Sequence, residues 1–279
     1  MGNSNSSLII YGIPGSQPTR VLFWACLLKQ LPFTVGASQN DLFFTDDTNP
    51  RGQIPAIVDG DFRLAEMGAI VHYLADKHGW SDLYPRDLQV RARIQEFLHR
   101  YHSLVRLATY KLMATFVVKP LAAANGNDDS PGVLARHVFT NPYSILFRDL
   151  FKVSFSTDKP LEEGGQAVRA IADFLEKNDF SGSAPFLCNA QSPSIADLVC
   201  YSELGQLQIA NLFDFGDYPG TLRWLSRMSE VPYHDTIHAY NIALGDLVSV
   251  PNTPERLKTA VDAGFKALEK TGLVTVMYK

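Results

Sequence analysis

Cysteine is scarce in this sequence. The 279 residues include three cysteines, Cys26, Cys188 and Cys200, an odd number without the spacing of a metal site. The sequence therefore predicts neither a disulfide framework nor a bound metal. Unpaired cysteines are typical of a reducing compartment, so we expect a cytoplasmic protein.

Basic charge and long apolar runs are also lacking. Lys and Arg number 25 against 29 for Asp and Glu, a formal net charge of −4 that leaves no basic face for nucleic acid. No run approaches the roughly 20 apolar residues that a membrane-spanning helix needs, and the polar first residues do not resemble a secretory signal peptide. The sequence thus predicts a globular protein, long enough for two modest domains, that binds no nucleic acid.

The first residues do match one membrane-targeting pattern. Met1-Gly2-Asn3-Ser4-Asn5-Ser6 fits the pattern for N-myristoylation of Gly2. A single acyl chain gives only marginal attachment without a polybasic segment, and no basic cluster follows. We expect membrane contact only if Gly2 is myristoylated, and a flexible tail otherwise.

The N-terminal part of the chain alternates between strand and helix signals. Asp59-Gly60 stands between two short apolar runs and is a strong hairpin signal, because both residue types tolerate the positive φ of a primed turn. The order, βαβ followed by ββα, is typical of a thioredoxin-like half-domain. The predicted elements are a strand over residues 8–11, a helix from Ser16 to about residue 29, a strand over 33–35, a hairpin over 56–64 and a helix from about residue 70.

Pro55 stands immediately before the first hairpin strand. A proline there cannot donate a ladder hydrogen bond and indicates a sharp turn of the backbone, for which a cis peptide is one solution. Such a turn exposes the backbone N–H and C=O of Ile54, with which a bound peptide pairs as though it were another strand. The alternative is a purely structural proline at the start of a strand.

From Leu88 onwards the pattern is helical. A stripe of apolar residues at spacings of three and four predicts one long helix that ends before Pro120, and residues 166–177 predict another. Ser194-Ile195-Ala196-Asp197 is similar to a capping box. A catalytic Ser–Asp pair is the alternative, but a helix follows directly, which favours the cap. Thr253 caps a final predicted helix.

Residues 49–74 resemble the glutathione-binding segment of the glutathione transferases. The pattern of that segment is Asn-Pro-x-Gly-x-Val-Pro-x-Leu-x-Asp-Gly-x-x-x-Leu-x-Glu-Ser-x-Ala-Ile, and this chain departs from it chiefly at Met67, where the pattern has Ser. The resemblance covers essentially the full chain. Three further segments are similar to the theta class of the family: Ser16-Gln17-Pro18-Thr19-Arg20, residues 84–93 and residues 218–232 with Trp224 inside it.

The resemblance implies an α+β fold. A thioredoxin-like glutathione-binding domain would span residues 1–81, followed by an all-helical substrate domain with an extended C-terminus over residues 82–279. The implied activity is conjugation of the glutathione thiolate to small electrophiles (halides, epoxides or aryl halides) or reduction of organic peroxides. Glutathione would be a co-substrate with no resident cofactor, and the protein would be a homodimer. The alternative is a catalytically weak binding or regulatory protein of the transferase fold, which Met67 would suit.

Ser16 is the residue expected to activate the thiol, as in serine-type members of the family. A free thiol has a pKa near 8.5 and is mostly protonated at neutral pH. A hydroxyl at a helix start donates a hydrogen bond to the thiolate, and the nearby amides add partial positive charge. Two alternatives are a Ser16 that acts only as an N-cap, and Tyr11 as the donor, although its place in a strand favours a core role.

The resemblance assigns the other glutathione contacts residue by residue. Ile54, before a cis Pro55, would pair through its backbone with the cysteinyl part, and Glu66 would bind the γ-glutamyl ammonium. Met67 would offer its amide to the γ-glutamyl carboxylate. The missing serine hydroxyl there removes a hydrogen bond worth about 1.5–3 kcal/mol, which weakens binding roughly tenfold to a hundredfold. The remaining assignments are Gln53 at the glycine end and Asn40 in the loop before it.

The electrophile pocket is expected between the first turn, the long helix and the C-terminal helices. By resemblance its lining includes Ile13, Tyr101, Arg106 and Tyr110. Arg106 falls where theta-like members carry an active-site arginine. A solvated arginine on the helix surface is the alternative.

Overall fold

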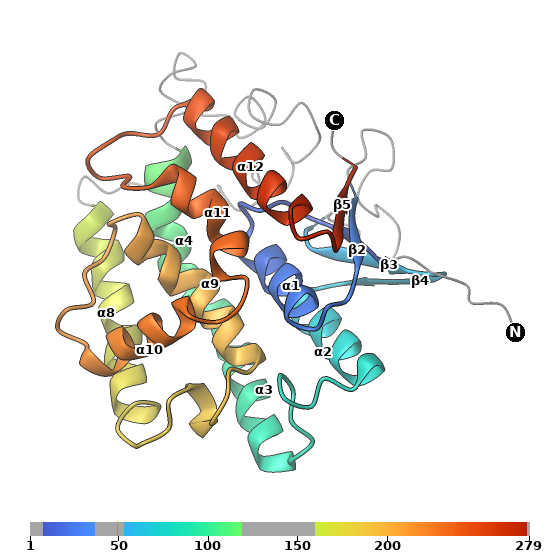
Figure 1. Cartoon of the computed structure of the whole chain (residues 1–279). Coiled ribbons are helices and arrows are strands. Elements are labelled where there is room, and N and C mark those ends of the chain that lie inside the picture. Colours follow the sequence, from blue (N-terminus) through green and yellow to red (C-terminus); the bar gives the residue numbers. More distant parts are fainter. Residues whose placement is uncertain (1–7, 37–48, 50–52, 119–159, 278–279) are drawn as a thin grey trace, which may run out of the picture.

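A mixed β-sheet and two helices form the N-terminal region of the protein (Figure 1). The computed structural model describes residues 8–36, 49, 53–118 and 160–277. The elements of this region are β1 (Leu8–Tyr11), α1 (Gln17–Leu28), β2 (Phe33–Gly36), β3 (Ala56–Asp59), β4 (Phe62–Ala65) and α2 (Met67–His78). They follow the predicted order, and the predicted thioredoxin-like fold is confirmed.

The described strands form one sheet in the order β4-β3-β1-β2-β5. β1 pairs in parallel with β2 and antiparallel with β3, which continues through a hairpin into β4. β5 (Val274–Val276) pairs in parallel with β2, with Val274 opposite Phe33. This strand was not predicted, because three residues carry too short a period-two signal to separate a strand from the helices before it.

Helices make up the rest of the described chain. α9 is apolar on nearly every side and is buried from Ile195 to Leu207, and α1 lies between it and the sheet (Figure 1). The predicted helical region after the sheet domain is thus confirmed, while the predicted boundary at residues 81 and 82 stays a prediction. The helices are α3 (Leu88–Ser103), α4 (Val105–Met113), a π-helix (Ala114–Val118), α8 (Pro160–Asn178), a 3₁₀ turn (Leu187–Asn189), α9 (Ile195–Ile209), α10 (Pro219–Ser229), α11 (His234–Leu244) and α12 (Pro254–Glu269).

Two local predictions were wrong in detail. The hairpin turns at Gly60 and Asp61, one residue later than predicted, because Asp59 still pairs with Phe62 and Gly60 supplies the positive φ of 63°. The single long helix predicted from Leu88 is interrupted at Leu104, whose φ of −113° and ψ of −74° depart from ideal helical values. A stripe of apolar residues shows that they share one buried face, but it does not show that they belong to one continuous helix.

The capping box at the start of α9 is confirmed. The Ser194 hydroxyl and amide both hydrogen-bond Asp197 Oδ2, at 2.9 and 2.8 Å. Asp197 Oδ1 also accepts from the Leu187 amide and the Trp224 indole. Burial nevertheless raises the pKa of Asp197 to about 6. The pair is occupied by structural contacts, so the catalytic alternative for it is not supported.

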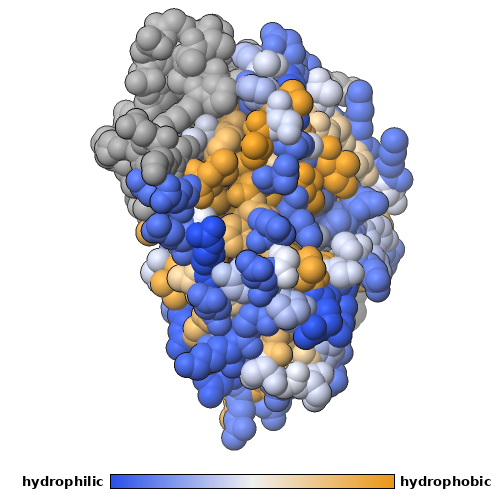
Figure 2. Space-filling model, turned by 90° about the vertical axis from the view of Figure 1, so that its left-hand side faces the viewer, coloured by the Kyte–Doolittle hydropathy of each residue, from blue (hydrophilic) through white to orange (hydrophobic). Residues whose placement is uncertain are grey.

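Within the described residues, no helix is long and apolar enough to cross a membrane. The same part of the chain holds no group of three His, Cys, Asp or Glu side chains arranged to bind a metal ion. Hydrophilic side chains dominate the lower half of the face shown in Figure 2, whereas apolar side chains gather in its upper half. Gly2 and residues 38–48 and 122–131 lie outside the described residues.

Candidate functional site

Ser16 lies where β1 has turned into α1. Its amide donates to the Ile13 carbonyl at 3.0 Å, which closes a tight turn over Pro14 and Gly15. Its Oγ accepts from the Thr19 amide at 3.4 Å, so Ser16 is the N-cap of α1. Accepting uses only an oxygen lone pair, and the half-buried hydroxyl keeps its proton for another acceptor. The cap and a donor role are therefore compatible.

Two C-terminal helices pack against this turn. A Cβ added to Gly15 would lie 3.1 Å from the Tyr240 ring of α11, and one added to Gly264 of α12 would lie 2.5 Å from the Pro14 Cβ. Glycine at both positions allows the close approach. The turn that presents Ser16 is therefore supported by residues more than 220 positions later in the chain.

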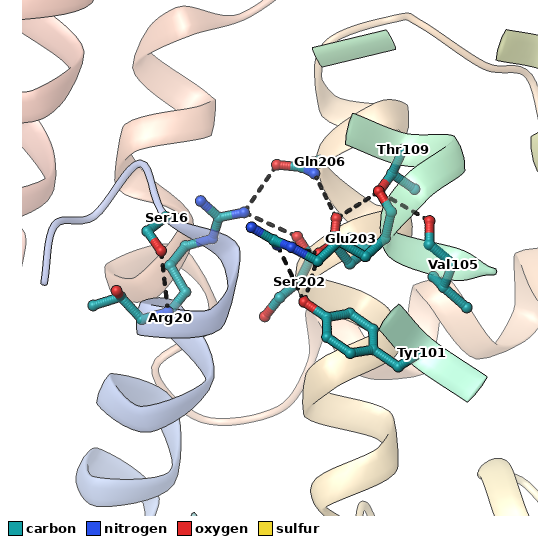
Figure 3. Close-up of polar contacts among 10 residues, drawn as sticks. Ser16, Arg20, Tyr101, Val105, Thr109, Ser202, Glu203 and Gln206 are labelled. Carbon is teal, nitrogen blue, oxygen red and sulfur yellow. Dashed lines mark hydrogen bonds and ion pairs between the residues drawn. The ribbon is translucent and has the colours of Figure 1, made fainter. Parts of the chain in front are cut away.

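Arg20, one turn into α1, is fully buried. Its Nη1 donates to the Pro14 carbonyl at 2.9 Å, inside the turn before Ser16. Its Nη2 donates to the Ser202 carbonyl at 2.9 Å and to Gln206 Oε1 at 3.0 Å, both on α9 (Figure 3). Burial lowers the pKa of Arg20 to about 10, so the side chain stays charged at neutral pH. Arg20 thus ties the Ser16 turn to the central helix.

Glu203 of α9 is the centre of this contact set. Its carboxylate is completely buried and accepts four hydrogen bonds (Figure 3). The donors are Tyr101 at 2.9 Å, Arg106 at 2.9 Å, Thr109 at 2.5 Å and Gln206 at 3.3 Å. We call Arg20, Tyr101, Arg106, Thr109, Glu203 and Gln206 the Glu203 network.

The network changes the interpretation of the expected electrophile pocket. Tyr101 is buried, and its hydroxyl donates to Glu203, so its polar atom is engaged in the network. Arg106 is not a solvated helix residue, because only 20% of its side chain is exposed and Glu203 holds its Nη1. Burial opposes its charge, but Tyr101 and Glu203 outweigh burial and raise the pKa of Arg106 above its ordinary value. Ile13 is buried, and Tyr110 is half-buried with its pKa raised by burial.

The second part of the site is the edge between β3 and α2, which we call the β3–α2 edge (Gln53, Ile54, Pro55, Glu66 and Met67). The peptide between Ile54 and Pro55 is cis, as expected from the resemblance. Asn49 is bonded to Gln53: its side chain accepts from the Gln53 amide at 3.0 Å and donates to the Gln53 carbonyl at 2.9 Å.

Glu66 and Met67 form the junction between β4 and α2. Glu66 is exposed and has a φ of 71°, a conformation that costs about 1–3 kcal/mol for a residue other than glycine. The Met67 side chain is only 4% exposed and packs in the main core. The first helical bond of α2 runs from the Ile70 amide to the Glu66 carbonyl, so the amides of residues 67–69 have no acceptor within the helix. A helix start whose amides have no acceptor in the helix is, in general, a place where anions bind.

The structure thus brings the candidate residues together in two groups, one around Ser16 and one at the β3–α2 edge. Tyr11, the competing donor, has its ring against Gly36 in the neighbouring strand, as a structural residue would. Asn40 lies outside the described residues. Sequence reasoning missed the roles of Arg20, Glu203 and Gln206. The available signal was a glutamate and a glutamine three residues apart within an otherwise apolar helix.

Comparison with known proteins adds independent findings. Residues 10–82 match the family described as glutathione S-transferase, N-terminal domain. The chain is 28% identical to glutathione S-transferase T2 of Arabidopsis thaliana over 83% of its length, but spans only 36% of that relative. It is 34% identical to human glutathione S-transferase theta-1 over 43% of this chain and 52% of that protein. The chain therefore covers about a third to a half of these relatives.

Among solved structures, the fold is similar to human glutathione transferase theta-2, whose crystal structure contains glutathione and an unknown ligand. The TM-score is 0.64 at 22% identity, with 95% of this chain and 99% of that chain covered. At this identity the likeness bears on the fold alone. It extends over both the sheet region and the helices.

Proposed function

We propose that this chain is a theta-like member of the glutathione transferase family and that it conjugates the glutathione thiolate to small electrophiles. The family relationship supports a transferase as the general activity. The serine-type mechanism, the substrates and the residue roles are our proposal. Halides, epoxides and aryl halides are the proposed electrophiles, with organic peroxides as substrates for reduction.

Ser16 is the observation that carries the proposal. Its Oγ accepts from the Thr19 amide and its proton remains free to be donated to the glutathione sulfur. The N-terminus of α1 adds partial positive charge at the same place. Lowering the thiol pKa by one unit requires about 1.4 kcal/mol, which a charge-assisted hydrogen bond supplies. The thiolate then attacks the electrophile, and the leaving group departs with the bonding electron pair.

The β3–α2 edge would hold the peptide part of glutathione. Ile54 would pair with the cysteinyl backbone, and the Glu66 carboxylate would bind the γ-glutamyl ammonium. The free amides at the start of α2, including that of Met67, would bind the γ-glutamyl carboxylate, as helix N-termini bind anions. Gln53 would contact the glycine end, and Asn40 is proposed from the resemblance alone.

The electrophile would enter between the Ser16 turn and α4. Ile13 and Tyr110 would provide apolar contact, and Arg106 would polarise a leaving group with the part of its guanidinium that Glu203 does not hold. A homodimer is proposed because Phe62 (45% exposed), Leu104 (54%) and Leu107 (45%) leave apolar surface on β4 and around α4 that a second copy would cover. With its cysteines unpaired, the protein is proposed to be cytoplasmic.

Replacing Ser16 by Ala tests the mechanism. We expect kcat to fall about 100- to 1,000-fold, because a hydrogen bond to the developing charge is lost. The Kd for glutathione, measured by isothermal titration, should change only a few-fold. Ser194→Ala is the matched control: it removes another N-cap and lowers stability by about 1 kcal/mol but should leave kcat unchanged. Equal losses of kcat and affinity in Ser16→Ala would contradict the donor role.

The substitution of Met67 for the family's serine favours one alternative, a transferase-fold protein that binds or regulates without efficient catalysis. Isothermal titration of the full chain separates the two functions. Micromolar to low-millimolar binding with turnover of an aryl halide supports the enzyme. Absence of binding at about 10 mM glutathione supports the alternative.

A further inference from the structure

Arg20 is buried next to the Ser16 turn but has no role in the proposed mechanism. It is a buried cation whose Nη1 binds the carbonyl of Pro14, two residues before Ser16. We propose that Arg20 is a positioning residue of the thiol site: it fixes the turn that presents Ser16 and places a positive charge, only partly compensated by Glu203, behind that turn. This inference deepens the proposed function and rests on it.

The charge balance of the Glu203 network supports this role. Two guanidiniums, those of Arg20 and Arg106, face one carboxylate, that of Glu203. Glu203 is hydrogen-bonded directly to Arg106, whereas it is linked to Arg20 by its charge and by hydrogen bonds through Gln206. The network therefore carries a net positive charge, with Arg20 on the side of Ser16 (Figure 3).

The other titratable groups that face Arg20 do not cancel this charge. Tyr101, Tyr240 and His238 surround it from α3 and α11. Burial raises the pKa of both tyrosines and lowers the pKa of His238 well below its ordinary value, so all three are neutral at pH 7. An anion that forms beside Ser16 would therefore meet the field of Arg20 through a low-dielectric interior.

The arrangement is also rigid. The Arg20 fork is held at one end by the Pro14 carbonyl and at the other by Ser202 and Gln206 of α9. A guanidinium fixed in this way does not reorganise when charge develops on the sulfur, which is the condition for electrostatic stabilisation of a transition state. A lysine at position 20 would keep the charge but could not hold three acceptors in the same planar geometry.

The test places a thiol at the site itself. In a Ser16→Cys protein, the pKa of the introduced thiol is read from the pH dependence of its alkylation by iodoacetamide, without glutathione. Adding Arg20→Met should raise that pKa by about one unit, whereas adding Glu203→Gln should lower it. Cys26 and Cys200 are buried and Cys188 is partly buried, so alkylation of the parent chain supplies the background.

Arg256→Met is the matched control. Arg256 also binds main-chain carbonyls, among them those of Leu244 and Asp246, but it lies in α12 at its far end from Gly264. It should leave the pKa of the introduced thiol unchanged. In the Ser16→Cys protein, Arg20→Lys should keep the thiol pKa low, because the positive charge remains. In the protein with Ser16, Arg20→Lys should reduce kcat, because the planar guanidinium that holds the three acceptors is lost.

A thiol pKa that rises in Arg20→Met and falls in Glu203→Gln supports the inference, since a purely structural role of Arg20 does not predict pKa shifts of opposite sign. Shifts of the same sign, or none, would overturn it. If Arg20→Met does not fold, a lowered thiol pKa in Glu203→Gln supports the inference and an unchanged one overturns it. The failure of glutathione to bind the parent protein would instead overturn the proposed function, while the thiol measurement still decides the role of Arg20.

Discussion

The Glu203 network and the β3–α2 edge form the two sides of the candidate site, and they are built in opposite ways. The network consists of buried side chains that come from α1, α3, α4 and α9. The edge offers mainly backbone groups, at Ile54 and at the start of α2, together with the exposed carboxylate of Glu66. The Glu203 network therefore depends on the identity of each side chain, whereas the β3–α2 edge depends mainly on the conformation of the backbone.

This difference explains how Met67 is accommodated. At a backbone site, a substitution is tolerated as long as the new side chain finds a place elsewhere, and Met67 finds it in the core. In the network, every polar side-chain atom that Figure 3 shows in a dashed contact is buried or largely buried, and only Arg20 Nε lacks a partner among the buried network atoms that the structure describes, so removal of one group leaves others unsatisfied. Mutations should therefore cost stability on the network side and ligand affinity at the edge.

The largest expected effect is that of Glu203→Ala. Its loss leaves the largely buried Arg106 without its counter-ion and the donors of Tyr101 and Gln206 without an acceptor, whereas the Thr109 hydroxyl keeps the Val105 carbonyl. The free energy of unfolding should fall by about 3–5 kcal/mol, as measured by urea denaturation. Glu66→Ala, at an exposed position, should change it by less than about 0.5 kcal/mol. Similar losses in both variants would remove the distinction between the two sides.

Met67→Ser should change both the stability of the protein and its affinity for glutathione. The buried thioether is lost from the core, so the free energy of unfolding should fall by about 2–5 kcal/mol. The new hydroxyl would lie at the start of α2 and should tighten glutathione binding roughly tenfold to a hundredfold. Urea denaturation and isothermal titration measure the two changes. An unchanged Kd would show that the backbone amide alone sets the affinity.

Glu66→Gln should affect binding without affecting the fold. The substitution removes the proposed charged partner of the γ-glutamyl ammonium, a hydrogen bond worth about 1.5–3 kcal/mol. We expect the Kd for glutathione to rise roughly tenfold to a hundredfold, with no change in the urea midpoint. Isothermal titration at two salt concentrations checks this, because an exposed ion pair weakens as salt is added. A salt-independent loss would assign Glu66 a different role.

The smallest expected effect concerns Asp59, at the far end of the same hairpin. Burial opposes ionisation of Asp59, but hydrogen bonds from Lys77 and Tyr73 outweigh it and lower its pKa. The resulting stability is present above about pH 4, the pKa of an unfolded Asp, and is lost as pH falls through the lower folded-state pKa. Lys77→Met should cost less than about 1 kcal/mol and reduce this acid dependence in urea titrations. If the free energy of unfolding of Lys77→Met has the same pH dependence as that of the parent protein, the Asp59–Lys77 pair contributes nothing to stability.

The sequence was most informative wherever structure is decided locally. The cis proline, the Ser16 and Ser194 caps and the order of the sheet elements all depend on residues a few positions apart. The break at Leu104 was missed because an apolar stripe does not distinguish one helix from two that share a face. The Ser16 donor role remains a prediction, since a cap alone gives the same local geometry.

The Glu203 network could not have been derived in this way. Arg20 and Ser202 are 182 positions apart, and Arg106 and Glu203 are 97 apart. The sequence shows that a glutamate lies in an apolar helix, and a buried glutamate requires a hydrogen-bonding or charged partner. The sequence does not show which arginine is that partner. The partner follows only from the packing of α9 between α1 and α4.

The pairing of β5 with β2 has a consequence for synthesis of the chain. β2 leaves the ribosome more than 200 residues before β5 does. While translation continues, a sheet assembled from β1 to β4 presents an open edge strand, a template for pairing with other nascent chains. The parallel pair of Phe33 and Val274 closes that edge only when residues 274–276 have emerged. We therefore expect nascent chains stalled before this strand to need chaperones more than the finished protein does.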